Sequence, residues 1–327
     1  MEYDTADSYI LKKGDLLFAR TGASVGKTYL YREKDGLVYF AGFLIRAKIR
    51  SDYCDEFVFQ NTLTNHYNQY IRITSQRSGQ PGVNAQEYGE YTFMLPNHDE
   101  QVRIGELFKH IDRLITLHQR KCETLQKLKK SMLQKMFPKN GSLYPEIRFA
   151  GFTDAWEQRK LSDVANRYDN LRVPITASKR VTGTTPYYGA NGIQDYVEGY
   201  THEGEFILVA EDGANDTINY PVQYVNGRIW VNNHAHVLQA IQKQADTRLL
   251  GYAISQADIA SILVGGGRAK LNADIMMKME LQLPKNLSEQ HQIGLYFKNL
   301  DNLITLHQRK LETLKKMKKS MLQKMFI

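Results

Sequence analysis

Cysteine, long apolar runs and familiar catalytic motifs are what this chain has least of. It holds two cysteines in 327 residues, whereas secreted chains are more often stapled by disulfide bonds. No stretch approaches the roughly 18 consecutive apolar residues of a membrane span. The N-terminal MEYDTADSY is acidic and polar, unlike a signal peptide. With 42% hydrophobic and 24% charged residues, the composition is that of a globular protein, which we expect in the cytoplasm.

The motifs of several enzyme classes are also missing. The chain contains no H-E-x-x-H, C-x-x-C or G-x-G-x-x-G pattern, which are signatures of zinc proteases, of thiol or zinc sites and of dinucleotide binders. His234 and His236 stand two apart, and two ligands alone do not make a metal site. We therefore predict no catalytic residue, no metal and no bound cofactor.

The stretch Ala19 to Tyr31, ARTGASVGKTYLY, falls one residue short of a phosphate-binding loop. Such a loop requires G-x-x-x-x-G-K-[ST], and counting back from Gly26 places Thr21 where the first glycine belongs. It must also lead into a helix whose N–H groups meet the phosphate. The β-branched and aromatic residues from Thr28 to Tyr31 favour a strand instead. A nucleotide-binding enzyme is thus an alternative that the spacing disfavours.

The net charge of +8 is concentrated in two segments, residues 112–137 and 301–326. Each holds seven Lys or Arg against two acidic residues, so the rest of the chain is slightly acidic. Segments of this kind favour a polyanionic partner, or a solvated or partner-docking helix face.

These two segments are copies of each other. LITLHQRKCETLQKLKKSMLQKMF (114–137) and LITLHQRKLETLKKMKKSMLQKMF (303–326) differ at three positions, which are Cys122/Leu311, Gln126/Lys315 and Leu128/Met317. A period of about 189 residues indicates the duplication of whole domains, because solenoid repeats are about 20 to 50 residues long.

Apolar residues inside each copy recur at steps of three and four, which is the pattern of a coiled-coil seam. The predicted seam is Ile111, Ile115, His118, Cys122, Leu125, Leu128, Met132 and Met136, matched by Leu300, Ile304, His307, Leu311, Leu314, Met317, Met321 and Met325. A single helix with one apolar stripe must cover it, so we predict two antiparallel helices of about 55 to 60 Å. We expect caps at Asn97 or Asp99 and at Ser288.

The parts before the helices repeat more loosely. Gly14–Ser24 corresponds to Gly204–Asn215, in each case a turn, a buried strand and a glycine loop. SGQPGVNA (78–85) matches GGGRAKLNA (265–273), shortly before Leu-Pro and the helix. The second copy has nothing equivalent to Gly26-Lys27-Thr28, which argues against a nucleotide site built on the shared fold.

The order of these motifs resembles the specificity (S) subunits of Type I restriction-modification systems. The resemblance covers essentially the whole chain. It rests on GDLLFARTGASVGK, RSGQPGVNA, LPNHDEQVRIGELFKHIDRLITLHQRK, PEIRFAGFTDAWEQRKLSDV, YYGANGIQDYV, ILVAEDGAN and SMLQKMF. It implies an α+β protein with two target-recognition domains of mixed α/β character, each reading one half of a split site in double-stranded DNA. Between them, two conserved spacer helices would dock two methyltransferase subunits.

The resemblance also assigns the chemistry to other chains. The partner subunits would methylate adenine with S-adenosylmethionine, and a restriction or motor subunit would use ATP and Mg. This chain has no adjacent prolines, which excludes the Pro-Pro signature of such methyltransferases. The implied boundaries are 1–95 and 147–283 for the recognition domains, 96–138 and 284–327 for the helices, and 139–146 for a linker.

The first recognition domain is about 45 residues shorter than the second. A truncated subunit that acts as a coiled-coil adaptor, or a half-subunit that dimerises, therefore stays open as an alternative.

A domain that reads DNA needs polar side chains at the groove edges and basic ones at the phosphates. The loops of the first half offer Arg20, Thr21, Ser24, Lys27, Gln76, Arg77, Ser78 and Gln80. Those of the second half offer Tyr188, Asn191, Asp212, Asn215, Asn232, Asn233, Arg268 and Lys270. Loops of this composition are also common as plain turns.

Overall fold

The computed structural model describes residues 7–139, 141–265 and 269–326. The chain forms two compact units, the first made of Met1–Cys122 with Leu306–Ile327 and the second of Glu123–Thr305. Each long helix therefore contributes one stretch to the first unit and one to the second. Among the described residues, no helix combines the length and apolar character that a membrane span requires. This division into units cuts each long helix in two, so it does not test the domain boundaries expected at residues 95, 138, 146 and 283, which stay a prediction.

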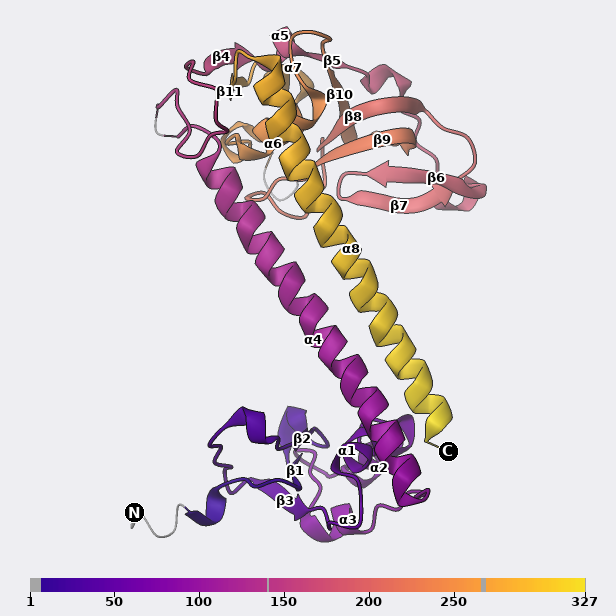
Figure 1. Cartoon of the computed structure of the whole chain (residues 1–327). Coiled ribbons are helices and arrows are strands. Elements are labelled where there is room, and N and C mark those ends of the chain that lie inside the picture. The colour runs from indigo at the N-terminus through magenta and orange to yellow at the C-terminus, as the bar shows by residue number, and fades with distance from the viewer. Residues whose placement is uncertain (1–6, 140, 266–268, 327) are drawn as a thin grey trace. The chain divides into compact units, whose positions relative to one another are not determined.

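The first unit is built on a three-stranded antiparallel sheet in the order β2-β1-β3 (Figure 1). Its strands are β1 (Asp15–Ala19), β2 (Thr28–Leu30) and β3 (Leu44–Lys48), and its short helices are α1 (Asp55–Asn61), α2 (Asn65–Thr74) and α3 (Ala85–Gly89). Leu16 of the central strand lies opposite Leu30 and both are 2% exposed, so they form part of the core. The strand predicted from Thr28 is confirmed as β2.

The second unit holds a six-stranded sheet in the order β5-β10-β8-β9-β6-β7, in which only β6 and β9 pair in parallel. Its strands are β5 (Ala165–Arg167), β6 (Thr182–Gly189), β7 (Gly192–Val197), β8 (His202–Ala210), β9 (Val222–Val231) and β10 (Ala235–Ala240). A separate pair joins β4 (Glu157–Lys160) to β11 (Glu280–Leu283). The short helices are α5 (Leu161–Val164), α6 (Thr247–Gln256) and α7 (Ala273–Met277).

Helix α6 covers one face of this sheet. It packs on β8 and β9, and its residues Leu249, Leu250 and Ile254 are fully buried (Figure 1). Burying such side chains stabilises the fold by about 1.5 to 3 kcal/mol each. The mixed helices and sheets confirm the α+β class.

The two long helices are α4 (His98–Lys135) and α8 (Leu287–Met325). In the first unit, Phe108 packs against Phe326 and His118 against His307, so these stretches run antiparallel. In the second unit, Lys129 pairs with Asp301 and Phe137 packs against Phe297, again antiparallel. The antiparallel arrangement predicted from the seam is confirmed.

The seam itself departs from the prediction at one repeated position. Ile111, Cys122, Leu125, Leu300 and Ile304 are buried, whereas Leu128 is 38% and Met317 41% exposed. The lysines next to these two residues, Lys129 and Lys318, are turned inward instead. They form ion pairs across the helix pair, Lys129 with Asp301 and Lys318 with Asp112. Met136 is buried as well. The remaining predicted seam residues, Ile115, His118, Met132, His307, Leu311, Leu314, Met321 and Met325, are half-buried.

One of the expected helix caps is wrong. Asn97 does accept the N–H of Glu100 at the start of α4 (3.0 Å). In α8 the cap is Asn286, whose side chain accepts the N–H of Ser288 (2.8 Å), and Ser288 itself lies inside the helix. Both caps are thus asparagines that stand at equivalent places in the repeat.

Candidate nucleic-acid interface

A pair of loops meets at the end of the central strand in the first unit. The N–H of Val83 donates to the carbonyl of Arg20 (2.9 Å), and Thr21 forms an isolated β-bridge with Gly82. Asn84 then caps helix α3 by accepting the N–H of Glu87. The loop after β1 and the loop before α3 therefore form one continuous surface.

The second unit repeats this arrangement. The N–H of Leu271 donates to the carbonyl of Glu211 (2.7 Å), and Asp212 forms an isolated β-bridge with Lys270. Asn272 caps helix α7 by accepting the N–H groups of the next turn. The loose sequence repeat is therefore also a repeat of backbone geometry, and it places predicted site residues from two distant segments side by side.

In the first unit these loops bring part of the predicted set together. Arg20, Thr21, Ser24 and Lys27 are exposed. A Cβ atom added to Gly22 would lie 2.8 Å from the side-chain nitrogen of Gln80, so Gln80 lies directly over that glycine. These five residues form one polar patch with two unpaired cations in the part of the chain that the structure describes.

Arg77 has a different place. Its guanidinium donates to the carbonyls of Thr74 (2.7 Å) and Gln76 (2.9 Å) and pairs with Glu87. These bonds hold the loop after α2 against α3. Gln76 and Ser78 are exposed beside it.

The amides of the ARTGASVGK loop are already used inside the unit. The N–H groups of Gly22, Val25, Gly26 and Lys27 donate to the carbonyls of Pro81, Gly22, Ala19 and Ser24. The hydroxyl of Thr28, which a P-loop would direct to a metal, lies 2.7 Å from that of Thr62. With these donors occupied and a strand following, the loop lacks the cradle that binds phosphate.

Gly22 to Gly26 also spell G-x-S-x-G. In hydrolases this pattern forms an elbow that turns from a strand into a helix, whereas here it joins β1 to β2. Gly26 has a φ of +81°, and a Cβ there would lie 2.5 Å from Ile71. Backbone conformation and packing therefore account for the second glycine, and Ser24 is a loop residue.

In the second unit, Asn191 organises the loop after β8. Its side-chain nitrogen donates to the carbonyl of Gly213 (2.8 Å), and its oxygen accepts the N–H of Asn215 (2.9 Å). Asn215 and Asn233 are exposed beside these contacts. Asn191 thus positions the loop, whereas Asn215 and Asn233 present their side chains to solvent.

A buried ion network supports this loop from below. His236, 1% exposed, places Nδ1 2.7 Å from Asp169. Glu211 accepts from Arg172 (2.7 Å) and from Lys270 (2.8 Å). Burial alone would raise the pKa of Asp169, but the hydrogen bond from His236 and its other partners hold that pKa below its usual range.

Three residues of this network, Asp169, Glu211 and His236, have the side chains of metal ligands. One ligand atom from each of Asp169, Glu211 and His236 lies within 4.8 Å of the others, a spacing that suits a cation. Arg172 and Lys270 already neutralise these carboxylates. The geometry is therefore that of an ion network that anchors the loop. His234 lies beside it, where its ring forms a hydrogen bond with Asp212 and its carbonyl accepts the N–H of Glu211 (2.9 Å).

Two predicted residues of the second unit are buried. Tyr188 is 9% exposed within a core cluster, where burial raises the pKa of its hydroxyl. Asn232 is 4% exposed and accepts the N–H of His234 (2.8 Å). Both shape the site from within rather than offer a surface to a base. Arg268 lies outside the described residues.

Sequence reasoning missed a pair of glutamines that attach each long helix to its unit. Gln101 donates to the carbonyl of the proline that precedes α4 (2.9 Å) and accepts the N–H of Cys54, which caps α1 (3.2 Å). Gln290 does the same with the proline before α8 (2.8 Å) and with Asp246, the cap of α6 (2.9 Å). The available signal was the repeated pattern E-Q-x-x-I-G-x-x-F in EQVRIGELF and EQHQIGLYF.

Comparison with known families agrees with this duplicated architecture. Residues 2–127 and 153–316 match the family described as the Type I restriction modification DNA specificity domain. The chain belongs to this family, and the resemblance stated from the sequence is confirmed.

Individual relatives give the extent of the likeness. The chain is 42% identical over 168 residues to a protein named as a type I restriction enzyme specificity subunit of Haemophilus influenzae, a match covering 51% of this chain but 42% of that protein. It is 19% identical to the MjaVIII specificity subunit of Methanocaldococcus jannaschii, over 97% of this chain and 79% of the relative. The chain thus spans less than half of the first relative's length and about four fifths of the second's.

Among solved structures, the S subunit of the Type-I restriction-modification system from M. genitalium has the same fold. The TM-score is 0.79 at 14% identity, over 98% of this chain and 85% of that one. The predicted arrangement of recognition domains and helices is therefore that of a known S subunit.

Proposed function

We propose that this chain is the DNA-reading specificity subunit of a Type I restriction-modification complex and catalyses no reaction itself. The observation that carries the proposal is the loop pair built twice, with Thr21 bridged to Gly82 in one unit and Asp212 to Lys270 in the other. Two such surfaces suit a split site, one half read by each unit. Each good bidentate contact to a base is worth about 1 to 3 kcal/mol of discrimination, so a few per unit suffice.

The partner surfaces would lie on the long helices. Leu114 and its repeat Leu303 are both 43% exposed, and Leu117 and its repeat Leu306 are 59% and 46% exposed. Because both copies read LITLHQRK, two identical methyltransferase subunits would each meet the same apolar surface. In this proposal S-adenosylmethionine, ATP and Mg bind to the partner subunits, and the complex works in the cytoplasm beside the DNA.

The proposal is tested by co-expressing the chain with methyltransferase subunits and mapping adenine methylation across the genome. We expect a split, asymmetric motif. The Asn215→Ala/Asn233→Ala variant removes two exposed side chains of the second unit. It should relax or change one half of the methylation motif and leave the other half intact. Asn226→Ala, an exposed asparagine on β9 away from the loops, is the matched control and should leave both halves unchanged.

Other outcomes distinguish the alternatives. A palindromic motif would indicate two copies that each read with one unit, as in a dimerising half-subunit. Absence of any motif, with the methyltransferase subunits still bound to the chain, would support a coiled-coil adaptor without DNA reading.

A further inference from the structure

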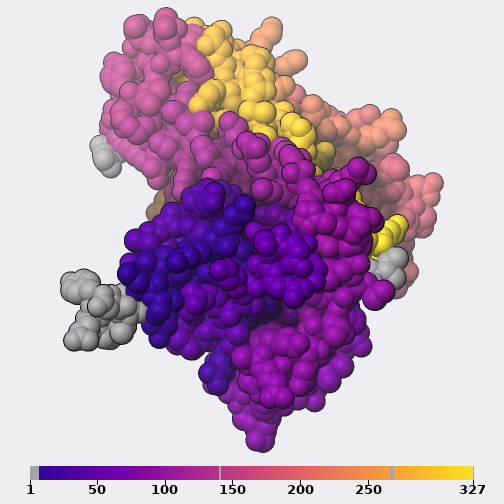
Figure 2. Space-filling view, turned by 60° about the horizontal axis from the view of Figure 1, so that its bottom comes forward, coloured from indigo at the N-terminus to yellow at the C-terminus, as the bar shows by residue number. Residues whose placement is uncertain are grey.

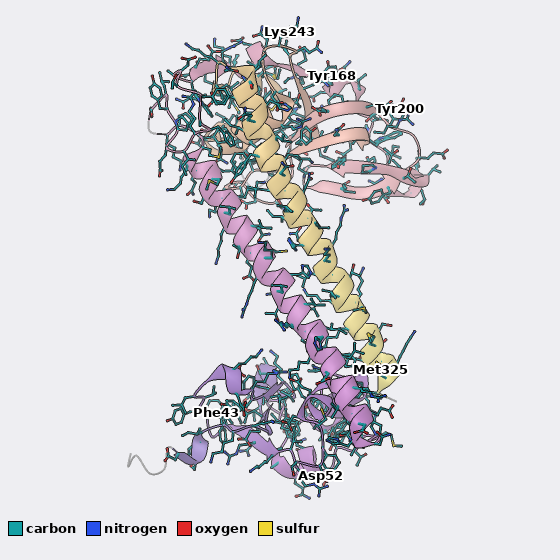
Figure 3. All side chains as sticks on the ribbon, viewed as in Figure 1. Phe43, Asp52, Tyr168, Tyr200, Lys243 and Met325 are labelled. Atoms are coloured by element: carbon teal, nitrogen blue, oxygen red, sulfur yellow. The ribbon has the colours of Figure 1, made fainter. Side chains whose placement is uncertain are left out.

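The hairpin of β6 and β7 carries an exposed glutamine, Gln194, at one edge of the six-stranded sheet (Figure 1). The two strands are joined by a turn of two residues, Ala190 and Asn191. Tyr200, labelled in Figure 3, follows β7 in the chain and so marks the end of the hairpin away from this turn. Figure 2 shows part of this sheet, in salmon, at the surface of the second unit.

Gln194 is the extra residue of a β-bulge. Tyr187 lies opposite Asp195 in the ladder between the two strands. The next residue, Tyr188, lies opposite Ile193, so the ladder skips Gln194. Bulges of this kind change the direction of a side chain, and they are frequent next to functional sites. The backbone therefore sets the direction of the Gln194 side chain.

Gly189 makes room for this side chain. A Cβ atom on Gly189 would overlap the side-chain nitrogen of Gln194. The backbone of Gly189 is not in the left-handed region, so its conformation does not require glycine. A glycine inside a strand weakens the strand, and it often marks a place where another group approaches closely. Here the approaching group is the amide of Gln194.

Asn232 orients the same amide. It is 4% exposed, its backbone N–H donates to Tyr188 (3.1 Å), and its side-chain oxygen accepts the N–H of His234 (2.8 Å). Its side-chain nitrogen donates to Oε1 of Gln194 (3.4 Å). A carbonyl oxygen has two lone pairs, so Oε1 can accept a second hydrogen bond. In the part of the chain that the structure describes, Nε2 of Gln194 donates to no other group. The amide thus offers one donor and one acceptor.

Gln194 belongs to the loop surface of the second unit. Asn191, in the turn of the same hairpin, holds the loop that carries Asn215. Asn232 is followed directly by the exposed Asn233. Gln194 therefore shares its supporting residues with both asparagines that are proposed above to read DNA.

We propose that Gln194 reads an adenine in the half-site of the second unit. Gln194 has this role only if the second unit reads DNA, so the assignment rests on the proposed function. In the major groove adenine offers N7 as an acceptor and its N6 amino group as a donor, and a glutamine amide matches both. Nε2 would donate to N7, and Oε1 would accept from N6. Gly189 and Asn232 are positioning residues that hold the amide for this contact.

The first test maps adenine methylation by the complex co-expressed with methyltransferase subunits. We expect Gln194→Ala to reduce the preference for adenine at one position of one half of the motif by about tenfold or more. Gln194→Glu replaces the donor by a second acceptor, which suits the amino group of cytosine, so the preferred base there should become cytosine. Gln242→Ala, an exposed glutamine in the turn after β10, is the matched control and should leave the motif unchanged.

A second variant displaces the amide and keeps its chemistry. Gly189→Ala should relax the same position of the motif as Gln194→Ala, because the new Cβ occupies the place of the amide. Combined with Gln194→Ala it should have no further effect on the motif. Gly251→Ala, whose Cβ would meet Ile207 at an ordinary 3.6 Å, is the control and should leave the motif unchanged.

The contact to N7 is tested by binding of the complex to synthetic DNA. Replacing the assigned adenine by 7-deazaadenine removes the N7 acceptor. We expect the wild-type complex to lose about fivefold in affinity, because one hydrogen bond is lost, and the Gln194→Ala complex to lose nothing.

Three results would overturn the assignment while the proposed function stands. The first is a split wild-type motif whose base preferences Gln194→Ala leaves unchanged, even if methylation falls overall, because Gln194 would then be structural. The second is relaxation at a G·C position. The third is an equal effect of 7-deazaadenine on both complexes. If the wild type yields no motif at all, the proposed function fails and the assignment fails with it. Gln194 is exposed, so loss of folding does not obscure these outcomes.

Discussion

Asp112 and Lys318 form an ion pair of 2.6 Å between the two long helices in the first unit. Its repeat, Asp301 with Lys129, is also 2.6 Å long and lies in the second unit. All four side chains are largely buried, with exposed fractions between 15% and 35%. At the places in the seam where the apolar pattern predicted Leu128 and Met317, the neighbouring lysines therefore form an ion pair across the helices, and this pair is the same in both units.

Removing the carboxylate of this pair should destabilise the first unit. Asp112 also accepts the side-chain amide of Gln60 (2.9 Å), so Asp112→Asn leaves a half-buried ammonium and disturbs a second bond. We expect a loss of about 1 to 3 kcal/mol in the free energy of unfolding, measured by chemical denaturation. Asp52→Asn, at an exposed ion pair, is the control and should change stability by less than about 0.5 kcal/mol. Equal stability of both variants would contradict a structural role for the pair.

Gly294 should tolerate no side chain. A Cβ there would lie 2.8 Å from Oδ1 of Asp246 and 2.9 Å from the N–H nitrogen of Leu249, which begin helix α6. We expect Gly294→Ala to cost about 1 to 3 kcal/mol by thermal or chemical unfolding. Gly251→Ala is the matched control, because its Cβ would meet Ile207 at an ordinary 3.6 Å and alanine favours a helix. A Gly294→Ala protein as stable as the Gly251→Ala protein would show that α8 can move away from α6.

Several features of the fold follow from local pattern. The antiparallel helices were predictable because two nearly identical stripes must each be covered, and β2 because Thr28 to Leu30 has strand-forming residues. The caps at Asn97 and Asn286 follow from side-chain chemistry one or two residues after a proline, although the pattern alone placed the second one at Ser288. Such features depend on a few neighbouring residues.

The rest depended on contacts between distant residues. Asp169 and His236 are 67 residues apart, and only the strand order of the six-stranded sheet brings them together. Tyr188 and Asn232 have the residue types of a DNA-reading loop, yet sheet topology buries both. For the candidate site, the sequence therefore identified the loops but not which side chains they expose.

Lys27 should contribute to DNA binding and not to nucleotide binding. It is exposed in the first unit, and the amides around it are already bonded within the loop. We expect Lys27→Ala to reduce the slope of log affinity against log salt by about 0.9 without affecting sequence preference, because one phosphate contact is lost. Lys34→Ala, an exposed lysine in the turn after β2, is the control. Measurable ATP binding in the wild type that Lys27→Ala abolishes would contradict our interpretation.

Acidification should loosen the helix pair of the first unit through its two histidines. His118 and His307 place their Nδ1 atoms 2.8 Å apart, so one ring must donate and the other accept. Desolvation, together with His118 and the nearby Lys121 and Lys310, lowers the pKa of His307. The unfolded chain therefore takes up this proton more readily than the folded one. The stability is complete above the ordinary histidine pKa of about 6.5 and is lost as pH falls below it towards the lowered value.

We therefore expect the Tm to fall between pH 7.5 and pH 5.5, and to fall less in the His118→Leu/His307→Leu variant, by about 2 °C or more. Leucine keeps the seam apolar and removes His307 together with its ring partner. His110→Gln, an exposed histidine of the same helix, should retain the full pH dependence and controls for histidine loss as such. The NMR signal of the His307 ring should titrate below the ordinary histidine pKa of about 6.5. If the double variant and the wild type lose the same Tm over this range, the acid sensitivity lies elsewhere in the molecule.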